Sequence, residues 1–389
     1  MRIAFAVQRY GLEINGGAEL HCRYVAEHLA KFADVEVLTT CARDYITWKN
    51  HYRSGVDSLH GIPVRRFTVE RHRDPLSFGR HQESLLRYPH TDAEELRWMD
   101  EQGPFSPEMI EYIRRNKDLY DLFIFFSYRY YHSFHGIHAV PHKSILVPTA
   151  EEDAVIKFRI FRGLFNLPQA FVYNSVEEKR LIQGVSSNYQ VPGDVVGVGS
   201  EIPESADGAA FRGKFGIHSP FLLYVGRIDE NKGCGQLFEF YERFRNETKS
   251  DLQLVLIGSP MMRIPDDPAV HALGFQDDVD KFNALAACEM LIMPSFYESL
   301  SMVLLEAWGM GRPTLANGNC PVLKGQSIRS NAGLFYTDYN EFRRGLNFLQ
   351  QRPEVKETLG QNGRKFYQDN YRWEIIEQKY LRLMEAARN

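Results

Sequence analysis

The sequence predicts an α/β fold of two doubly wound parallel-sheet domains that face each other across a cleft. Short apolar runs alternate with amphipathic stretches, which is the pattern of a parallel sheet covered by helices on both faces. Residues 201–209 are rich in Pro, Gly, Ser and acids, and the alternation restarts after them. The length of 389 residues also favours two domains over one.

The first domain is predicted over residues 1–202. Short runs rich in Val, Ile, Leu and Phe indicate its buried strands, and a helix that starts near Gly17 forms the first crossover. These strands are expected at 2–8, 35–41, 64–70, 122–127, 144–149, 171–175 and 195–200.

The second domain is predicted over residues 203–372. A helix is expected from about 301 to 310, long helical patterns close the chain, and the last helix, 373–389, has no strand after it. The strands are expected at 221–227, 252–259, 290–295 and 312–318. In such folds ligands bind beyond the carboxyl ends of the strands, so we expect the site in the cleft.

Composition excludes several classes of protein. The 46 Lys and Arg residues against 50 Asp and Glu give a net charge of −4, so we expect no nucleic-acid partner. Five cysteines without a Cys-x-x-Cys pair favour neither a disulfide framework nor a zinc site, which indicates a reducing cytoplasm. The N-terminus lacks the pattern of a signal peptide, and no apolar run approaches a spanning length.

A glycine pair, Gly16–Gly17, stands where the first predicted strand turns into a helix. Backbone N–H groups and the helix dipole at that position suit a phosphate. The spacing is not G-x-G-x-x-G, so a nicotinamide dinucleotide is disfavoured. The alternative is a simple tight turn, in which such glycines are common.

Two cations follow the first strand of the second domain. Arg227 and Lys232 lie five residues apart on a predicted turn. A guanidinium and an ammonium that converge on one diphosphate would neutralise a leaving group that gains negative charge. Taken alone, the pair favours a solvated turn.

Two carboxylates, Glu298 and Glu306, form an E-x7-E segment across a loop and the following helix. Glu298 is placed to reach sugar hydroxyls, Glu306 to accept both ribose hydroxyls, and the N–H groups between them to hold phosphates. The alternative makes Glu298 a dipole partner and Glu306 a surface residue. Apolar neighbours surround Glu306, however, and a carboxylate in such a setting needs a partner.

Together and in this order, these features resemble glycosyltransferase family 4, the retaining nucleotide-sugar enzymes with a GT-B fold of two Rossmann-like domains. The resemblance spans nearly the whole chain and includes residues 274–277 before a helix. In the family the C-terminal helix, here 373–389, packs back on the first domain. Softer matches to enzymes of bacterial surface-polysaccharide assembly lie at 48–52, 64–67 and 146–150.

The resemblance implies an acceptor-binding first domain and a donor-binding second domain. It places Arg227 and Lys232 on the donor diphosphate, with no metal and no cofactor. It also implies Glu306 on the ribose, Glu298 on the transferred sugar and Phe275 at the base pocket. The full donor-binding set predicted is Gly16, Gly17, Arg227, Lys232, Gly258, Phe275, Glu298, Leu300, Ser301, Met302 and Glu306.

The chain departs from the family at two positions. Ser301 stands where relatives carry glycine, so its side chain is expected to narrow the space at the sugar. Glu151 follows the 144–149 strand where relatives commonly carry a histidine. We therefore predict a catalytic set of Glu298, Arg227, Lys232 and Glu151, in which Glu151 disfavours a uronic-acid donor. The alternative is that Glu151 and the two acids after it simply begin the next helix.

Two further patterns remain open. Asp278 and Asp280 form an Asp-x-Asp pair of the kind that binds divalent ions, but helix capping is the favoured explanation. A basic and aromatic stretch fits either a membrane or lipid-diphosphate surface or a solvated loop. It contains Arg65, Arg66, Arg71, Arg73, Arg80 and Arg87, with Phe67, Phe78 and Tyr88 between them. The run 128–132 would line an acceptor groove or pack in the core.

The function expected from this resemblance is transfer of a sugar, with retention, from a nucleoside-diphosphate sugar to a glycan or lipid-linked acceptor in polysaccharide or glycoconjugate biosynthesis. The expected location is the cytoplasm, with a peripheral contact at the inner face of the membrane as one variant. A nucleotide-sugar hydrolase or epimerase is the first alternative. A non-catalytic nucleotide-sugar-binding protein is the second.

Overall fold

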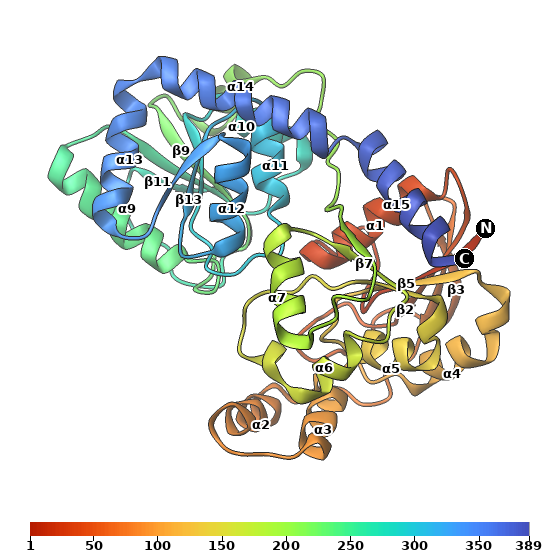
Figure 1. Cartoon of the computed structure of the whole chain (residues 1–389). Helices are drawn as coiled ribbons and strands as arrows, with labels where there is room; N and C mark the ends of the chain where they lie inside the picture. Colours follow the sequence, from red (N-terminus) through yellow and green to blue (C-terminus); the bar gives the residue numbers. More distant parts are fainter. Residues whose placement is uncertain (389) are drawn as a thin grey trace. The chain divides into compact units, whose positions relative to one another are not determined.

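The computed structural model describes residues 1–388, which divide into two compact units (Figure 1). Unit 1 contains Met1–Val198 together with the chain from Trp373 onward, and unit 2 contains Gly199–Arg372. The structure thus places the change of unit at Val198–Gly199, close to the 202–203 boundary that the sequence predicts. Each unit is described by itself below.

Unit 1 is built on a sheet in which every neighbouring pair is parallel except one, and its central strands are apolar and buried on both faces. In spatial order the strands are β3 (Gly55–Leu59), β4 (Ile62–Phe67), β2 (Asp34–Thr40), β1 (Arg2–Ala6), β5 (Leu122–Phe126), β6 (Ser144–Val147), β7 (Ala170–Tyr173) and β8 (Gly193–Val195). The predicted α/β class with a doubly wound parallel sheet is confirmed for this unit.

The prediction missed β3, which pairs antiparallel with β4 at the sheet edge. Its sequence, GVDSL, is largely exposed, so it lacks the apolar run by which the other strands are recognised. A tight turn joins the two strands, and both His60 and Gly61 in it have positive φ values of 49° and 81°. Positive φ at both central residues is the conformation that suits a two-residue hairpin.

Helices cover both faces of the first sheet. The helical stretch 75–116, which the sequence prediction left unassigned, begins with Pro75 after the Asp74 cap. Thr91 and Glu94 form a reciprocal capping box in the same stretch. The helices of unit 1 are α1 (Gly17–Leu29), α2 (Pro75–Arg87), α3 (Asp92–Gln102), α4 (Pro107–Asn116), α5 (Tyr131–Ala139), α6 (Arg159–Leu164), α7 (Val176–Ser186) and α15 (Trp373–Arg388), with short 3-10 turns η1 (Lys117–Leu119), η2 (Pro141–Lys143) and η3 (Val155–Lys157).

The C-terminal helix α15 completes unit 1. The Trp373 ring stacks on the His28 ring of α1 with 3.6 Å between centroids, and Glu377 lies 2.7 Å from the His28 Nδ1. On the other side Lys379 donates to the Val195 carbonyl at 3.2 Å. The helix α15 therefore connects α1, the first helix of the chain, with β8, the last strand of the first sheet.

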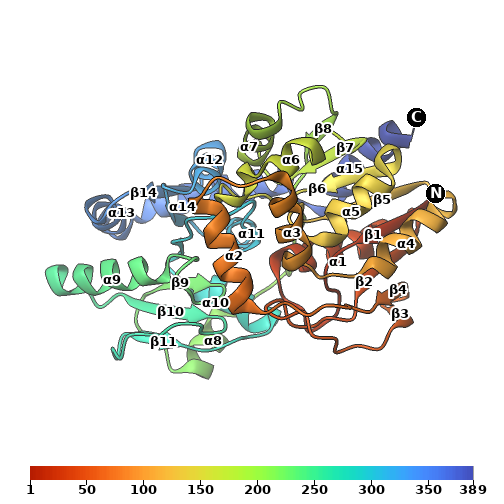
Figure 2. The same ribbon diagram turned by 90° about the horizontal axis from the view of Figure 1, so that it is seen from below.

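Unit 2 carries a second, wholly parallel sheet, which confirms the predicted class here as well. Its strands in spatial order are β11 (Val270–Ala272), β10 (Gln253–Ile257), β9 (Phe221–Val225), β12 (Met290–Met293), β13 (Thr314–Asn317) and β14 (Gly333–Tyr336), and Figure 2 shows β9, β10 and β11 side by side. The edge strands β11 and β14 are additions to the prediction. Both are short and only partly buried, so their apolar runs are weak.

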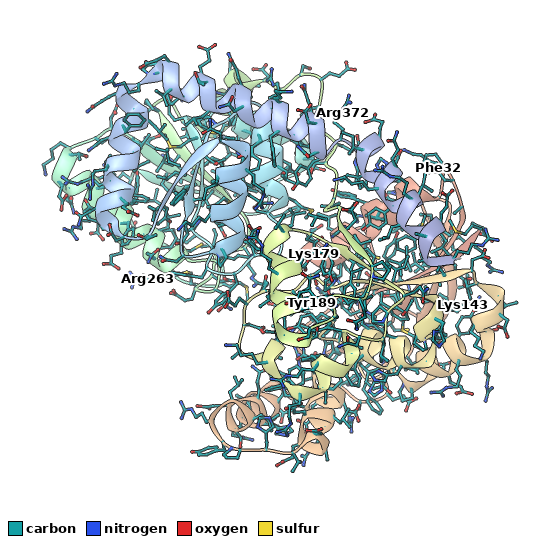
Figure 3. The ribbon with its side chains drawn as sticks, viewed as in Figure 1. Phe32, Lys143, Lys179, Tyr189, Arg263 and Arg372 are labelled. Atoms are coloured by element: carbon teal, nitrogen blue, oxygen red, sulfur yellow. The ribbon has the colours of Figure 1, made fainter. Side chains whose placement is uncertain are left out.

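The helices of unit 2 are α8 (Gly208–Phe215), α9 (Cys234–Thr248), α10 (Asp278–Ala287), α11 (Met302–Gly309), α12 (Pro321–Ser330), α13 (Tyr339–Gln351) and α14 (Pro353–Asn370). The expected linker 201–209 ends early, because Asp207 caps α8 by accepting from the N–H groups of Ala209 and Ala210. Side chains fill the space between helices and sheet in both units (Figure 3).

No helix within residues 1–388 is long and apolar enough to cross a membrane. The five cysteines, all of which lie in this described part of the chain, are free and buried.

Candidate functional site

The candidate site is built on the carboxyl edge of the second sheet. The loops after β9, β10 and β12 leave adjacent parallel strands, so they meet at one edge. A Cβ built on Gly258, where φ is +145°, would lie 1.9 Å from the Gly226 carbonyl oxygen. Glycine at 258 is therefore required for the β9 and β10 loops to approach each other, while its predicted contact with a donor stays a prediction.

The loop after β9 brings Lys232 to Glu298. Their side chains lie 2.8 Å apart and are 29% and 9% exposed, so the pair is largely shielded but still accessible. Asp229 organises the same loop: its carboxylate accepts from the Lys232 backbone N–H at 2.8 Å and pairs with the Arg227 guanidinium. The structure thus brings together the two predicted cations and the first carboxylate of the E-x7-E segment.

Glycine at 233 makes this approach possible. Its φ is +72°, and a Cβ there would lie 2.1 Å from the Pro294 carbonyl oxygen in the loop after β12. Any larger residue would separate the Lys232 loop from the Glu298 loop.

Glu306 lies on α11 and is buried, as its apolar neighbours indicated. Its Oε1 accepts from the Lys281 ammonium at 2.8 Å, which supplies the partner that the sequence required but did not identify. Its Oε2 is buried and has no hydrogen-bond partner within residues 1–388. Burial raises the pKa of the Glu306 carboxyl, and the Lys281 charge opposes that shift.

Ser301 has a structural role in α11, and its predicted effect on the space at the sugar stays a prediction. It is the N-cap of α11, and its Oγ accepts from the Leu304 N–H at 3.3 Å. The hydroxyl therefore occupies one of the N–H groups that a helix start leaves unsatisfied. The N–H of Met302, in the first turn, has no intrahelical carbonyl to bond, so it remains a candidate donor to a phosphate.

The acids at the start of α10 form ion pairs and a cap. The cap is Asp277, one residue before the predicted pair, and its side chain accepts from the Asp280 N–H at 2.9 Å. Asp278 lies 2.9 Å from Lys281, and Asp280 lies 2.5 Å from Lys214. Within residues 1–388 no group of three or more acids, histidines or cysteines is arranged to hold a metal ion.

The predicted base-pocket residue, Phe275, is 63% exposed, and Tyr297 beside Glu298 is 44% exposed. Aromatic rings left open to solvent next to charged loops are suited to stack on a planar base or a sugar. Sequence reasoning did not select Tyr297. Its position next to Glu298 is the only signal that the sequence carries.

In unit 1 the glycine pair lies against a buried ion pair. Gly16 is the N-cap of α1, and a Cβ on it would lie 2.2 Å from the Glu19 Oε2 and 3.1 Å from an Arg9 terminal nitrogen. The Arg9–Glu19 distance is 2.5 Å, with both side chains about a tenth exposed or less. A side chain at position 16 would therefore displace the Glu19 carboxylate, and the predicted phosphate contact of Gly16 remains a prediction.

Glu151 lies in the loop after β6, and it does not begin a helix: the next helical turn, η3, starts at Val155. The backbone just before it is fixed. Thr149 has a φ of +47° and shares a 2.8 Å hydrogen bond between its Oγ1 and the Ser127 Oγ. The Ala150 N–H donates to the buried Glu178 Oε1 at 2.5 Å. The loop that presents Glu151 is therefore anchored on both β5 and α7.

The basic stretch is divided: Arg71, Arg80 and Arg87 are exposed, whereas the side chains of Arg65, Arg66 and Arg73 make contacts inside the unit. Arg65 pairs with the buried Glu36 at 2.9 Å, and Arg66 donates to the Tyr10 carbonyl at 2.8 Å. Arg73 bonds backbone carbonyls, including that of Ile46 at 2.7 Å. The aromatic run 128–132 belongs mainly to the core of unit 1, where Tyr128 and His132 are each 1% exposed.

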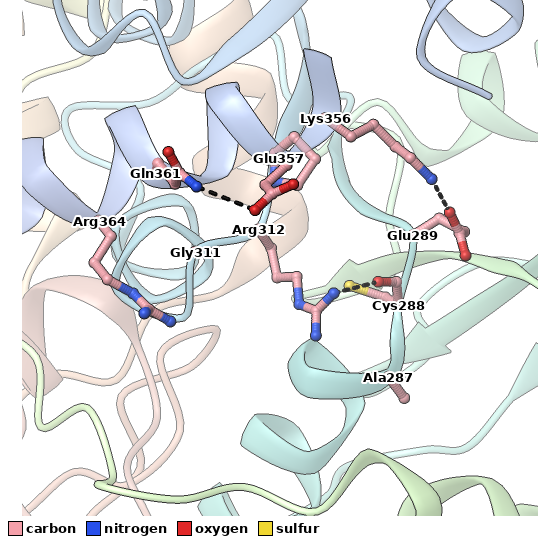
Figure 4. Close-up of a pocket in the computed structure, with 10 residues that line it drawn as sticks. Ala287, Cys288, Glu289, Gly311, Arg312, Lys356, Glu357, Gln361 and Arg364 are labelled. Carbon is pink, nitrogen blue, oxygen red and sulfur yellow. Dashed lines mark hydrogen bonds and ion pairs between the residues drawn. The ribbon is translucent and has the colours of Figure 1, made fainter. Parts of the chain in front are cut away.

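A cavity of about 490 Å³ lies in unit 2 away from these loops (Figure 4). It is lined at the residues that precede β12 and β13, including Glu289 and Arg312, and by Lys356 and Arg364 of α14. Arg312 donates to the carbonyls of Ala286 and Cys288 at the end of α10. The cavity therefore lies at the amino edge of the sheet, whereas the predicted residues gather at the carboxyl edge.

The fold is that of GT-B glycosyltransferases. The chain is similar over 99% of its length to sucrose-phosphate synthase from Thermosynechococcus elongatus, with a TM-score of 0.73, 18% identity and 98% of that chain covered. Its fold is also similar to that of Anabaena Alr3699/HepE in complex with UDP and glucose, with a TM-score of 0.70, 16% identity, and coverage of 98% of this chain and 99% of that one.

The sequence comparisons match part of the chain to a known family. Residues 219–349 match the family described as glycosyl transferases group 1. The chain is 27% identical to an MMP alpha-(1->4)-mannosyltransferase of Mycolicibacterium hassiacum over 48% of each chain. It is 28% identical to an alpha-D-kanosaminyltransferase of Streptomyces kanamyceticus over 40% of this chain and 42% of that protein. The chain thus spans about half the length of the curated relatives it matches.

Proposed function

We propose that this protein is a retaining glycosyltransferase that moves a sugar from a nucleoside-diphosphate sugar to a glycan or lipid-linked acceptor. The observation that carries the proposal is the set of groups at one edge of the second sheet: two cations, Arg227 and Lys232, and the carboxylates Glu298 and Glu306. These groups lie inside the segment, residues 219–349, that matches the family described as glycosyl transferases group 1.

In the proposed reaction the bond between the sugar C1 and the diphosphate oxygen breaks, and a bond from C1 to the acceptor oxygen forms on the same face. The acceptor proton goes to the leaving diphosphate, so no separate base is needed. Arg227 and Lys232 stabilise the negative charge that develops on the diphosphate. Glu298, held by Lys232 at 2.8 Å, accepts hydrogen bonds from the hydroxyls of the transferred sugar.

Glu306 is assigned to the ribose and the first turn of α11 to the phosphates. Glu151, on the anchored loop of unit 1, is assigned to the donor sugar. Gly16 and Gly17 are assigned to the phosphate from the acceptor-binding unit. These assignments extend the family pattern, and no metal ion takes part in them.

A uridine donor and a lipid-linked acceptor are the first pair to test. The similar structure of Anabaena Alr3699/HepE holds UDP-glucose in one of its complexes. A Campylobacter jejuni relative, 30% identical over 100 residues, transfers N-acetylgalactosamine to a diphospho-undecaprenol acceptor according to its name. With such an acceptor the protein would act at the inner face of the membrane.

Calorimetric titration with UDP, GDP, ADP and NAD, each with and without EDTA, tests the donor site. Binding of one diphosphate that is unaffected by EDTA and weakened by Arg227→Ala is the expected result. Arg344→Ala, an exposed arginine on α13, is the matched control and should bind as the wild type does. Binding of NAD alone, or of none of the four, would refute the proposal.

Product analysis separates the alternatives. With a nucleotide sugar and a membrane-lipid extract, a transferase forms a glycosylated lipid or glycan together with the free diphosphate. Consumption of the donor without acceptor would instead identify a hydrolase or epimerase. Binding without any turnover would identify a non-catalytic nucleotide-sugar-binding protein.

A further inference from the structure

Lys281 is a largely buried lysine of α10 whose ammonium pairs with two carboxylates. Its ammonium lies 2.8 Å from the Glu306 Oε1 and 2.9 Å from the Asp278 Oδ1, and its side chain is 15% exposed. Asp278 is 72% exposed and Glu306 only 10%, so the bond to Glu306 is the shielded one. The lysine is absent from the predicted donor-binding set, because its position on α10 gave no indication of this contact.

The two carboxylate oxygens of Glu306 differ in their hydrogen bonding. Oε1 is held by Lys281, whereas Oε2 is buried without a hydrogen-bond partner in the described chain. A buried acceptor left unpaired is costly, and native proteins keep few of them without a functional reason. The opposite charge of Lys281 also favours the ionised carboxylate, and only this form accepts hydrogen bonds on both oxygens.

We propose that Lys281 is a positioning residue that holds Glu306 through Oε1, keeps Oε2 as the acceptor for a ribose hydroxyl, and so makes the site select ribonucleotides over deoxyribonucleotides. This inference rests on the proposed function, in which Glu306 receives the ribose. A ribose hydroxyl that displaces the atoms now covering Oε2 gives this oxygen its missing donor. A deoxyribose leaves it unpaired, and a site built around a hydroxyl discriminates strongly against the analogue that lacks it.

The binding of ribo- and deoxyribonucleotides distinguishes a positioning role of Lys281 from a purely structural one. If Lys281 only ties α10 to α11, its loss weakens the binding of ribo- and deoxyribonucleotides by the same factor. If Lys281 positions Glu306, its loss weakens the binding of ribonucleotides alone. Asp278→Asn removes the exposed half of the lysine's pairing and leaves the 2.8 Å bond to Glu306 in place.

The experiment measures, by calorimetry, the dissociation constants of the preferred nucleoside diphosphate and of its 2′-deoxy and 3′-deoxy forms. The proteins compared are the wild type, Lys281→Met, Lys281→Arg and Asp278→Asn, each checked for folding by circular dichroism. The wild type should discriminate against at least one deoxy form about tenfold or more, the effect of one hydrogen bond to a charged group. Lys281→Met should reduce this ratio to about one, whereas Asp278→Asn should keep it.

Lys281→Arg retains a cation at the same place, so it should keep most of the discrimination. It also serves as the decisive variant if Lys281→Met fails to fold: loss of binding for both sugar forms alike in Lys281→Arg would overturn the inference. A wild-type ratio that Lys281→Met leaves unchanged would overturn it too, and the proposed function would stand. If the wild type binds no nucleoside diphosphate, the proposed function itself fails.

Discussion

Replacing Gly360 by alanine tests how closely α14 must lie on the end of α11, the helix that carries Glu306. A Cβ on Gly360 would lie 2.1 Å from the Gly311 carbonyl oxygen, whereas non-bonded heavy atoms rest about 3.5 Å apart. Backbone faces backbone here, so α14 and the 310–311 turn have to separate by about 1.4 Å. Overpacking of this kind costs about 1–3 kcal/mol.

Helix propensity works in the opposite direction. Glycine to alanine inside a helix stabilises by about 1 kcal/mol when nothing obstructs the new methyl group. We therefore expect Gly360→Ala to lower the free energy of unfolding by up to about 2 kcal/mol. Gly213→Ala on α8 is the matched control, because a Cβ there meets no atom within 4 Å. This variant should gain about 0.5–1 kcal/mol.

Urea unfolding followed by circular dichroism measures the two variants against the wild type. A chain of two units need not unfold in a single two-state transition. Circular dichroism follows both units together, so binding of the preferred nucleoside diphosphate is measured in the same samples to follow the unfolding of unit 2. A Gly360→Ala protein as stable as Gly213→Ala would refute the packing argument.

Three further predictions concern single residues and the metal. Burial raises the pKa of Glu178 to about 8, so between about pH 5 and about pH 8 the folded state holds a proton that the unfolded state releases. The free energy of unfolding should therefore fall over this range by up to about 1.4 kcal/mol per pH unit. Glu178→Gln should flatten this slope in urea unfolding at several pH values, and an unchanged slope would contradict the assignment. Glu151→Gln should lower kcat about tenfold or more in a steady-state transfer assay, because the contact that positions the donor sugar is lost. Glu152→Gln, at the exposed neighbouring residue, should leave kcat unchanged. Equal kcat values for Glu151→Gln and the wild type would remove Glu151 from the mechanism. EDTA should leave the transfer rate unchanged, because Arg227 and Lys232 are proposed to neutralise the charge that develops on the diphosphate, and a rate that EDTA abolishes and added Mg²⁺ restores would contradict this.

The central strands could be predicted because burial on both faces leaves a strong sequence pattern. The strand that runs Leu122–Phe126 consists of apolar residues that are all buried. The edge strands carry less of that pattern: Gly55–Leu59 is mostly exposed, and Val270–Ala272 has only three residues. A short or exposed strand is defined by its hydrogen-bonded neighbour, which the local sequence does not reveal.

In the candidate site, too, the local sequence predicted some features, whereas others depend on the tertiary structure. The need of Glu306 for a partner was evident from its apolar neighbours, but the partner lies 25 residues earlier on another helix, so its identity depended on the tertiary structure. Glu178 is a similar case. Its place in the first turn of a helix is ordinary for an acid, and only the fold buries it beneath the loop that presents Glu151.

The position of α15 has a consequence for the order of folding. The ribosome completes residues 1–198 long before it makes Trp373, so the contacts of His28 and Val195 with α15 cannot form until this helix has been synthesised. Unit 2, which is contiguous, can fold as soon as Arg372 has emerged. The unit that is synthesised first is thus finished last, and a nascent chain that stalls before α15 would expose the apolar surface that the helix covers.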